Sequence, residues 1–79
     1  MTTHISIERS GSYGGFCAYL DGHSAPVIKP VPGNARPATR WIWETIGEAA
    51  REMLSIFGPG TVIRYREDNG SEWKRWGGI

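Results

Sequence analysis

Residues 38–57 place the strongest constraint on the fold, because their apolar side chains recur with the period of an α-helix. At ~100° per residue, one stripe of such a helix is apolar and the opposite arc is charged. Pro37 suits the start of a helix, and Gly58, Pro59 and Gly60 supply a terminal glycine and a stop. The pattern predicts one amphipathic helix over residues 38–57 that packs its apolar stripe against another element. That stripe consists of Ile42, Ile46, Ala49, Met53, Ile56 and Phe57, widened by Trp43, Ala50 and Leu54.

The segment before this helix has the alternating pattern of β-strands. Residues 3–9 place Ile5 and Ile7 on one face, and residues 13–20 form a second strand after a Ser/Gly turn. Residues 25–31 contain two prolines, which cannot donate hydrogen bonds to a strand ladder. We therefore expect a hairpin followed by an edge strand or an extended arm.

The segment after the helix predicts a second hairpin. Residues 61–67 and 71–76 flank Asn69-Gly70, which is a strong signal for a two-residue hairpin turn. One helix lying across one face of an antiparallel sheet is the simplest way to bury both apolar faces. The sequence therefore predicts a single α+β domain over residues 1–79, with an antiparallel sheet of four to five strands and the order β-β-(β)-α-β-β.

Length and charge restrict the classes of function. The chain has 79 residues and a net charge of +1, from nine lysines and arginines against eight aspartates and glutamates. A chain of this length has little apolar surface to spare for a deep substrate pocket. The charge balance argues against an acidic DNA mimic and against a general polycation, so any electrostatic function must come from local clusters.

Targeting signals are not evident in the sequence. The N-terminal residues lack the basic and apolar regions of a signal peptide, and no apolar run reaches the ~20 residues of a membrane-spanning helix. A single cysteine, Cys17, cannot form a disulfide within the chain. These features predict a cytoplasmic protein.

Residues that could perform catalysis or hold a metal are few and scattered. His4 and His23 are the only histidines, and Cys17 has no neighbouring His or Lys to lower its pKa. This inventory matches no zinc-site spacing. A stripe of glutamates on the expected helix faces outward beside arginines, which is typical of a solvated helix face. The sequence therefore predicts no enzyme activity, no cofactor and no metal.

The closing hairpin carries the most informative cluster. If the predicted two-residue turn forms, Arg66 pairs with Trp73 and Arg64 pairs with Arg75 across the two strands. These four side chains then share one face, with three guanidinium groups around an indole. Such a face suits phosphates, exposed bases or acidic protein surfaces. The other face of this hairpin, which would meet the helix, carries Ile63, Tyr65 and Trp76.

A three-residue turn with a bulge is the alternative for this hairpin. It would send Trp73 inward beside Tyr65 and turn Lys74 outward with Arg64 and Arg66. Either register exposes clustered positive charge.

Trp41 is the second unusual residue, because it falls on the charged arc of the predicted helix. It is either covered by the proline-rich arm before the helix or it is an anchor for a partner. The candidate partner-binding residues are therefore Arg64, Arg66, Trp73, Arg75, Lys74 and Trp41.

The closing run of residues 60–70, with the Trp-Lys-Arg-Trp sequence at 73–76, resembles the terminal hairpin of small phage-encoded anti-CRISPR proteins that inhibit type I surveillance complexes. Residues 12–16, Ser-Tyr-Gly-Gly-Phe, are also similar to members of that group. The resemblance implies a phage or mobile-element inhibitor that binds a CRISPR effector complex, a ribonucleoprotein, in the cytoplasm of a bacterial host. Such an inhibitor blocks target DNA engagement by occluding a surface and does no chemistry.

A small nucleic-acid-binding module is the alternative function, in which an antitoxin-like or integrase-arm-like domain contacts DNA with a sheet face. The low net charge counts against it, because appreciable affinity for DNA usually needs several phosphate contacts. A structural or assembly subunit is a third possibility.

Overall fold

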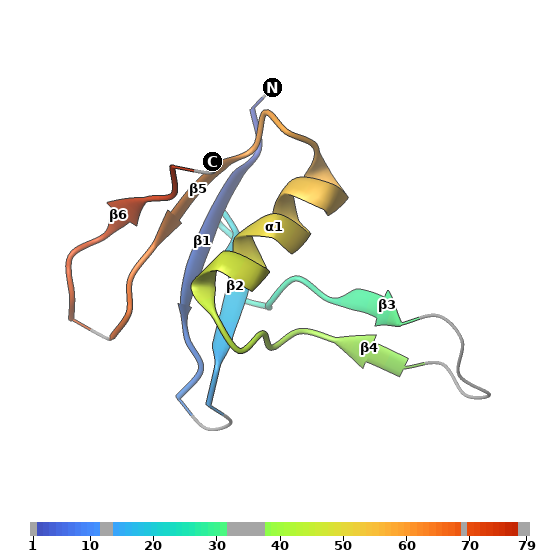
Figure 1. The fold of residues 1–79 in the computed structure, drawn as a ribbon, viewed down its shortest axis with the longest axis horizontal. Coiled ribbons are helices and arrows are strands. Elements are labelled where there is room, and N and C mark those ends of the chain that lie inside the picture. The colour runs from blue at the N-terminus through green and yellow to red at the C-terminus, as the bar shows by residue number, and fades with distance from the viewer. Residues whose placement is uncertain (1, 12–13, 32–37, 69, 78–79) are drawn as a thin grey trace.

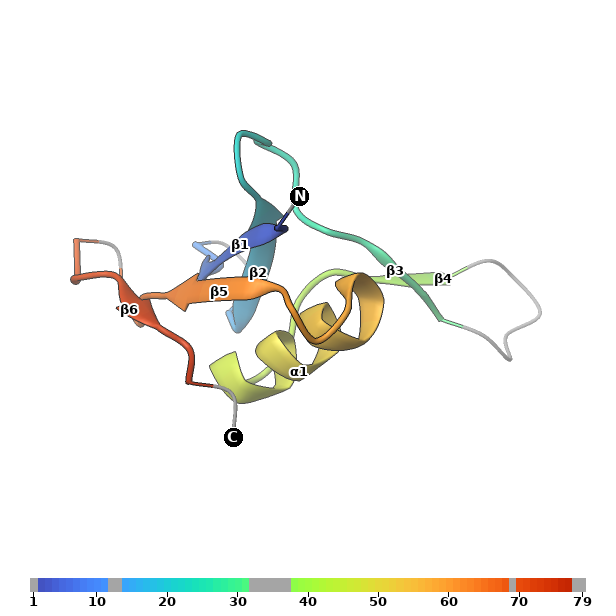
Figure 2. The ribbon, with the colours of Figure 1, turned by 90° about the horizontal axis from the view of Figure 1, so that it is seen from above.

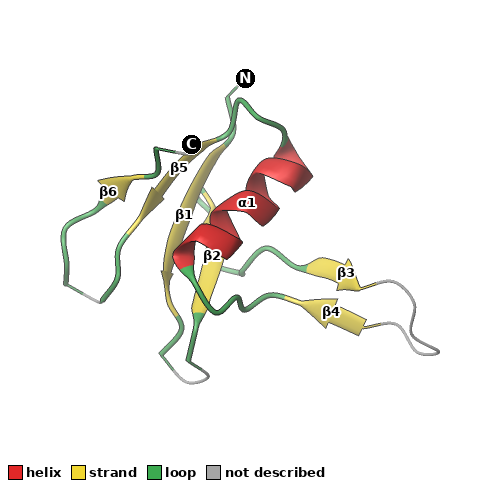
Figure 3. Cartoon of the chain, in the orientation of Figure 1, coloured by secondary structure: helices red, strands yellow, loops and turns green. Residues whose placement is uncertain are grey.

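A computed structural model describes residues 2–11, 14–31, 38–68 and 70–77 of the chain. Pro37 and Asn69, on which two of the predictions above depend, lie outside the described residues. Figures 1 and 3 show the strands and the single helix within those described ranges. The elements in chain order are β1 (His4–Arg9), β2 (Phe16–Leu20), β3 (Lys29–Val31), β4 (Ala38–Arg40), α1 (Ile46–Phe57), β5 (Val62–Tyr65) and β6 (Lys74–Arg75).

The main sheet has four strands in the order β2-β1-β5-β6, and α1 packs on one of its faces. Viewed from above, the helix lies entirely to one side of this sheet (Figure 2). The predicted α+β class, with one helix on one face of a sheet, is thereby confirmed. Among the described residues, no helix is long and apolar enough to cross a membrane.

The sheet is mixed, whereas the sequence predicted antiparallel pairing throughout. β1 pairs with β2 antiparallel but with β5 parallel, with Ile5 opposite Ile63 and Ile7 opposite Tyr65. The direction follows from the helix, because α1 ends near the start of β1 (Figure 1). The chain therefore begins β5 beside that start, where the Val62 amide donates to the carbonyl of Thr3, and runs alongside β1 in the same direction.

The predicted helix start at residue 38 is wrong, because α1 begins at Ile46. Thr45 is the N-cap, and its hydroxyl accepts a hydrogen bond of 3.1 Å from the amide of Glu48. Thr and Glu at this spacing form the sequence pattern of a capping box, which marks the start of a helix. The prediction from periodicity did not use this signal. Ahead of the cap, the backbone of Trp43 exchanges two hydrogen bonds with Phe16, which holds this segment extended against β2.

The core lies between α1 and the main sheet. Its helical contribution comes from Ala49, Ala50 and Met53, while Trp43 fills the space beside the first turn at 1% exposure. The predicted stripe is thus correct at its centre. Ile56 was wrongly assigned to the core, because it lies at the edge of the stripe in the last turn and is 42% exposed. The sheet contributes Ile5, Ile7, Phe16, Ala18 and Ile63.

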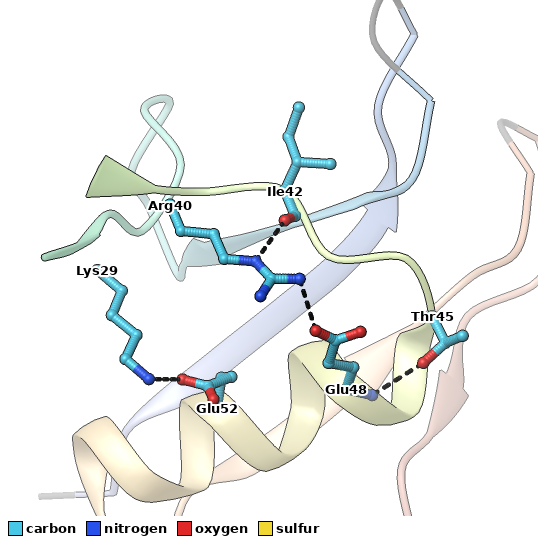
Figure 4. A network of polar contacts seen from close by, with 6 residues as sticks. All are labelled: Lys29, Arg40, Ile42, Thr45, Glu48 and Glu52. Carbon is cyan, nitrogen blue, oxygen red and sulfur yellow. Dashed lines mark hydrogen bonds and ion pairs between the residues drawn. The ribbon is translucent and has the colours of Figure 1, made fainter. Parts of the chain in front are cut away.

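Residues 25–31 form an arm that ends in the short strand β3. The sequence had predicted either an edge strand or an extended arm for this segment. β3 pairs antiparallel with β4 in a separate two-stranded sheet beside α1 (Figure 1). Two ion pairs join β3 and β4 to the charged side of the helix (Figure 4). Lys29 bonds Glu52, and Arg40 Nη2 lies 2.6 Å from Glu48 Oε1. Glu48 and Glu52 of the helix therefore anchor the β3–β4 sheet.

Candidate binding surface on the open face of the sheet

One face of the main sheet is not covered by any helix or strand among the described residues (Figure 2). We call it the open face. It is the side opposite α1, and the loop that follows β2 rises beside it (Figure 2). By strand alternation and register, its side chains are His4, Ser6, Glu8, Cys17, Tyr19, Arg64, Arg66, Trp73 and Arg75.

The closing hairpin has the register of the predicted two-residue turn. Arg64 lies opposite Arg75 and Tyr65 opposite Lys74. The amide of Ser71 donates to the carbonyl of Asp68 at 3.0 Å, which closes the turn. Gly70 adopts a φ of +89°, a conformation that favours glycine. The bulged alternative is thereby excluded.

The inner face of this hairpin packs toward the helix as predicted. Ile63 is buried, and Trp76 packs against the core with its ring at 75° to that of Tyr65, at a centroid separation of 6.3 Å. Lys74 shares the register position of Tyr65 and so belongs to this inner side. Among the candidate residues, Lys74 is therefore separated from the arginines of the open face.

Trp73 is the centre of the cluster on the open face. The guanidinium carbon of Arg64 lies 4.4 Å from the Trp73 ring centroid, and that of Arg66 lies 4.6 Å from it. Trp73 as a residue is 37% exposed. Stacking on an aromatic ring restricts each arginine to few orientations, so the guanidinium groups are held in place before any partner arrives.

The two stacked arginines differ in their charge partners. Arg66 donates from Nε and Nη2 to Glu8 Oε2, at 3.1 and 2.8 Å, and this ion pair is only 24% and 28% exposed. Arg64 donates from Nε to the hydroxyl of Ser6 at 2.8 Å, and no carboxylate among the described residues pairs with it. Of the three guanidinium groups predicted around the indole, those of Arg64 and Arg66 stack on Trp73; Glu8 neutralises Arg66, whereas no described carboxylate neutralises Arg64.

Arg64 belongs to a row of residues that crosses all four strands. Ser6 lies opposite Tyr19 on one side and Arg64 on the other, and Arg64 lies opposite Arg75. Like charges directly opposite each other on neighbouring strands are unfavourable unless an anion lies near them. Arg75 is exposed and, like Arg64, has no carboxylate partner in the described part of the chain.

A shallow hollow of about 360 Å³ adjoins this row on the open face. Its walls come from the sheet and from the loop of residues 20–24 that follows β2. The residues that matter for recognition are Ser6, Glu8, Tyr19, Asp21, Arg64 and Trp73. The hollow can accept a planar group between polar and aromatic walls, although it is too open for a buried substrate.

The thiol and the phenol of β2 are both protonated near neutral pH. Burial raises the pKa of Cys17, against hydrogen bonds from Ser10 and Tyr19 that lower it. Burial also raises the pKa of Tyr19, with smaller contributions from Cys17 and Glu8. Cys17 is 1% exposed. It therefore has neither the ionisation nor the access of a nucleophile, and Tyr19 lines the hollow with its hydroxyl bonded to this thiol.

Trp41 lies outside this surface, on the segment between β4 and α1. The prediction placed it on the charged arc of a helix, and that placement is wrong because the helix begins after it. It is half-buried. The structure thus brings Arg64, Arg66, Trp73 and Arg75 together and leaves Trp41 and Lys74 apart from them.

Ser6, Glu8 and Tyr19 are the members of the surface that sequence reasoning missed. Alternation along the first strand did place Ser6 and Glu8 on an outward face. Their arginine partners, however, are 58 positions away in the sequence. Only the pairing of β1 with β5 brings them together.

Comparisons of the chain with protein-family models, with curated proteins and with solved structures find no match. Among the described residues, no group of three or more His, Cys, Asp and Glu side chains is placed to hold a metal ion. The open face is therefore the feature of the molecule from which a function can be inferred.

Proposed function

We propose that this chain is a non-catalytic binding protein and that its contact surface is the open face around Arg64 and Trp73. The observation that carries the proposal is the arrangement of Arg64, which is fixed by Trp73 and Ser6 and lacks a carboxylate partner among the described residues. A charged group already held in place loses less conformational freedom on binding. Arginine and tryptophan are also the residues in which binding energy is commonly concentrated.

The positions of the potential catalytic groups support a role without chemistry. His4 and His23 are both exposed at the same end of the β1–β2 pair, and Cys17 is buried. Neither histidine has a side-chain hydrogen bond among those described, and Cys17 is bonded to the hydroxyls of Ser10 and Tyr19, neither of which is the base that nucleophilic catalysis requires. A binding role needs only a surface.

We propose that the partner is a bacterial CRISPR effector complex, that the chain is a phage or mobile-element inhibitor, and that it acts in the cytoplasm of the host cell by blocking target DNA engagement. The support for this partner is the resemblance of residues 60–70 and 73–76 to anti-CRISPR proteins. The open face is compatible with it, because its two unpaired arginines suit either acidic side chains or the guide backbone of a ribonucleoprotein.

Co-purification with candidate effector complexes tests this function. The double variant Arg64→Glu, Arg75→Glu reverses the charge of the two exposed arginines without touching the Arg66–Glu8 pair. We expect it to lose both retention on the complex and inhibition of target DNA binding, because like charges across an interface repel. Arg51→Glu, at an exposed position on α1, is the matched control and should keep both.

Two results would contradict the proposal. Full inhibition by the double variant would show that the open face is not the contact surface. Tight, strongly salt-dependent binding to plain duplex DNA, with no effector complex retained, would indicate the nucleic-acid-binding module instead.

A further inference from the structure

We propose that the open face binds single-stranded nucleic acid, with a phosphate held by Arg64 and Arg75 and the adjoining base in the hollow beside Tyr19 and Trp73. This inference rests on the proposed function in taking the open face as the contact surface. It goes further by stating which part of a ribonucleoprotein that face would touch.

The arginine pair supplies the phosphate site. Arg64 and Arg75 lie directly opposite each other on β5 and β6 with no described carboxylate partner, so an anion between them relieves their repulsion. The Nε of Arg64 is occupied by Ser6, which fixes the guanidinium and leaves its terminal nitrogens free to donate. Two charge-assisted donors on neighbouring strands match the oxygens of a phosphodiester.

The hollow supplies the site for a base. Tyr19 and Trp73 form part of its walls. Because two guanidinium groups already stack on the Trp73 ring, Tyr19 is the aromatic side chain that would stabilise an unpaired base by stacking. Asp21 also lines the hollow, where its carboxylate can accept from the amino group of a base.

The same carboxylate disfavours the rival ligand. An acidic peptide drawn to the two arginines would meet Asp21 in the adjoining hollow, and like charges there repel it. In a nucleotide the negative charge is on the phosphate and the base is neutral. The phosphate can therefore lie at the two arginines while the neutral base lies beside the carboxylate in the hollow. The hollow, with the Asp21 carboxylate beside aromatic walls, therefore favours a nucleic acid over an acidic protein segment.

The size and charge of the open face favour a single strand over a duplex. Three interstrand spacings make the sheet only ~14 Å wide, measured between its outer strands. Two unpaired arginines also offer fewer phosphate contacts than duplex binding usually requires. A single strand adds stacking energy, and its bases are free to enter the hollow.

Fluorescence anisotropy with labelled single-stranded oligouridylate tests the inference, with single-stranded DNA, duplex DNA and polyglutamate as comparison ligands. We expect the single strands to bind more tightly than the duplex at about 50 mM salt. Arg64→Gln should weaken binding about tenfold and reduce the slope of log affinity against log salt by about 0.7, the effect of one lost phosphate contact. Tyr19→Leu should weaken binding without changing that slope, because it removes stacking and no charge.

Arg51→Gln is the matched control, because Arg51 is an exposed residue of α1, the helix that covers the opposite face of the sheet. This variant should bind like the unmodified chain. A circular dichroism spectrum checks that each variant is folded. If Arg64→Gln disturbs the hairpin, Arg75→Gln probes the same phosphate site from an exposed position that makes no contact with Trp73 among the described interactions.

The outcomes separate this inference from the proposed function. Binding of polyglutamate but not of oligonucleotides, lost in Arg64→Gln, would overturn the inference while effector retention still supports the function. Equal affinity for duplex and single strand would also overturn it. Arginine-dependent binding of single strands without retention on any effector complex would support the inference and contradict the assignment of the partner.

Discussion

At the scale of single residues, two arginines of one strand have different roles. Arg64 and Arg66 both stack on Trp73, yet one is bonded to a hydroxyl and the other to a carboxylate. The difference arises from β1, which presents Ser6 to one and Glu8 to the other. Arg64 therefore keeps a charge for a partner, whereas Arg66 and Glu8 stabilise the pairing of β1 with β5.

Charge reversal at these two positions should consequently have unequal effects on stability. Arg66→Glu places two carboxylates together in a partly buried site, and we expect it to lower the free energy of unfolding by about 2 kcal/mol. Arg64→Glu changes an exposed position, and its cost should stay within about 1 kcal/mol. Urea denaturation measures both values. Equal losses in the two variants would mean that the ion pair with Glu8 does not stabilise the fold.

At the scale of elements, α1 is short and depends on its cap. It has 12 residues, and isolated helices of this length are marginal in water, so packing and capping must hold it. Thr45 satisfies one of the unpaired amides of the first turn. The backbone bonds between Phe16 and Trp43 fix the chain just before that cap.

Thr45→Ala should therefore lower the free energy of unfolding by about 1 kcal/mol. Thr39→Ala, an exposed threonine in β4, is the matched control and should change it by less than about 0.5 kcal/mol. Thermal unfolding followed by circular dichroism compares the two. If the helix began at residue 38 instead, Thr45 would not be a cap and its substitution would be as mild as the control. A loss at Thr45 no larger than the loss at Thr39 would therefore contradict the observed start.

At the scale of the whole molecule, stability depends on a small core between one helix and one sheet. Met53 is fully buried at the centre of the α1 stripe, whereas Ile46 is half-buried beside it. A chain of this length buries a smaller fraction of its surface than larger domains do, so each core side chain has a large share of the stability. The open face can bind a partner without weakening this core, because it lies on the other side of the sheet (Figure 2).

Met53→Ala should lower the free energy of unfolding by about 2–5 kcal/mol, since it removes a buried side chain and leaves a cavity. Ile46→Ala should cost less, because part of its side chain is already in water. Ile56→Ala should change stability by about 0.5 kcal/mol or less. Urea denaturation of the three variants checks the order. A larger loss at Ile56 than at Met53 would mean that the helix packs on a different face.

The sequence by itself determined the features that depend on neighbours along the chain. The alternation around Ile5 and Ile7, the stop after Phe57 and the register that sets Arg64 opposite Arg75 were all predicted correctly. Strand alternation, a terminal glycine and a two-residue turn are local properties of the backbone, so they can be recognised without knowing the fold.

Only the tertiary structure decided the features that join distant segments. Trp43 lies extended ahead of the helix because its backbone is bonded to Phe16 on another strand. The charge of Arg66 is neutralised because Glu8 lies beside it, although the two residues are 58 positions apart. Periodicity carries no information about which strands become neighbours, and a parallel pair requires a crossover that no local signal specifies. The candidate residues on the closing hairpin were therefore predictable, whereas their division into a free arginine and a paired one was not.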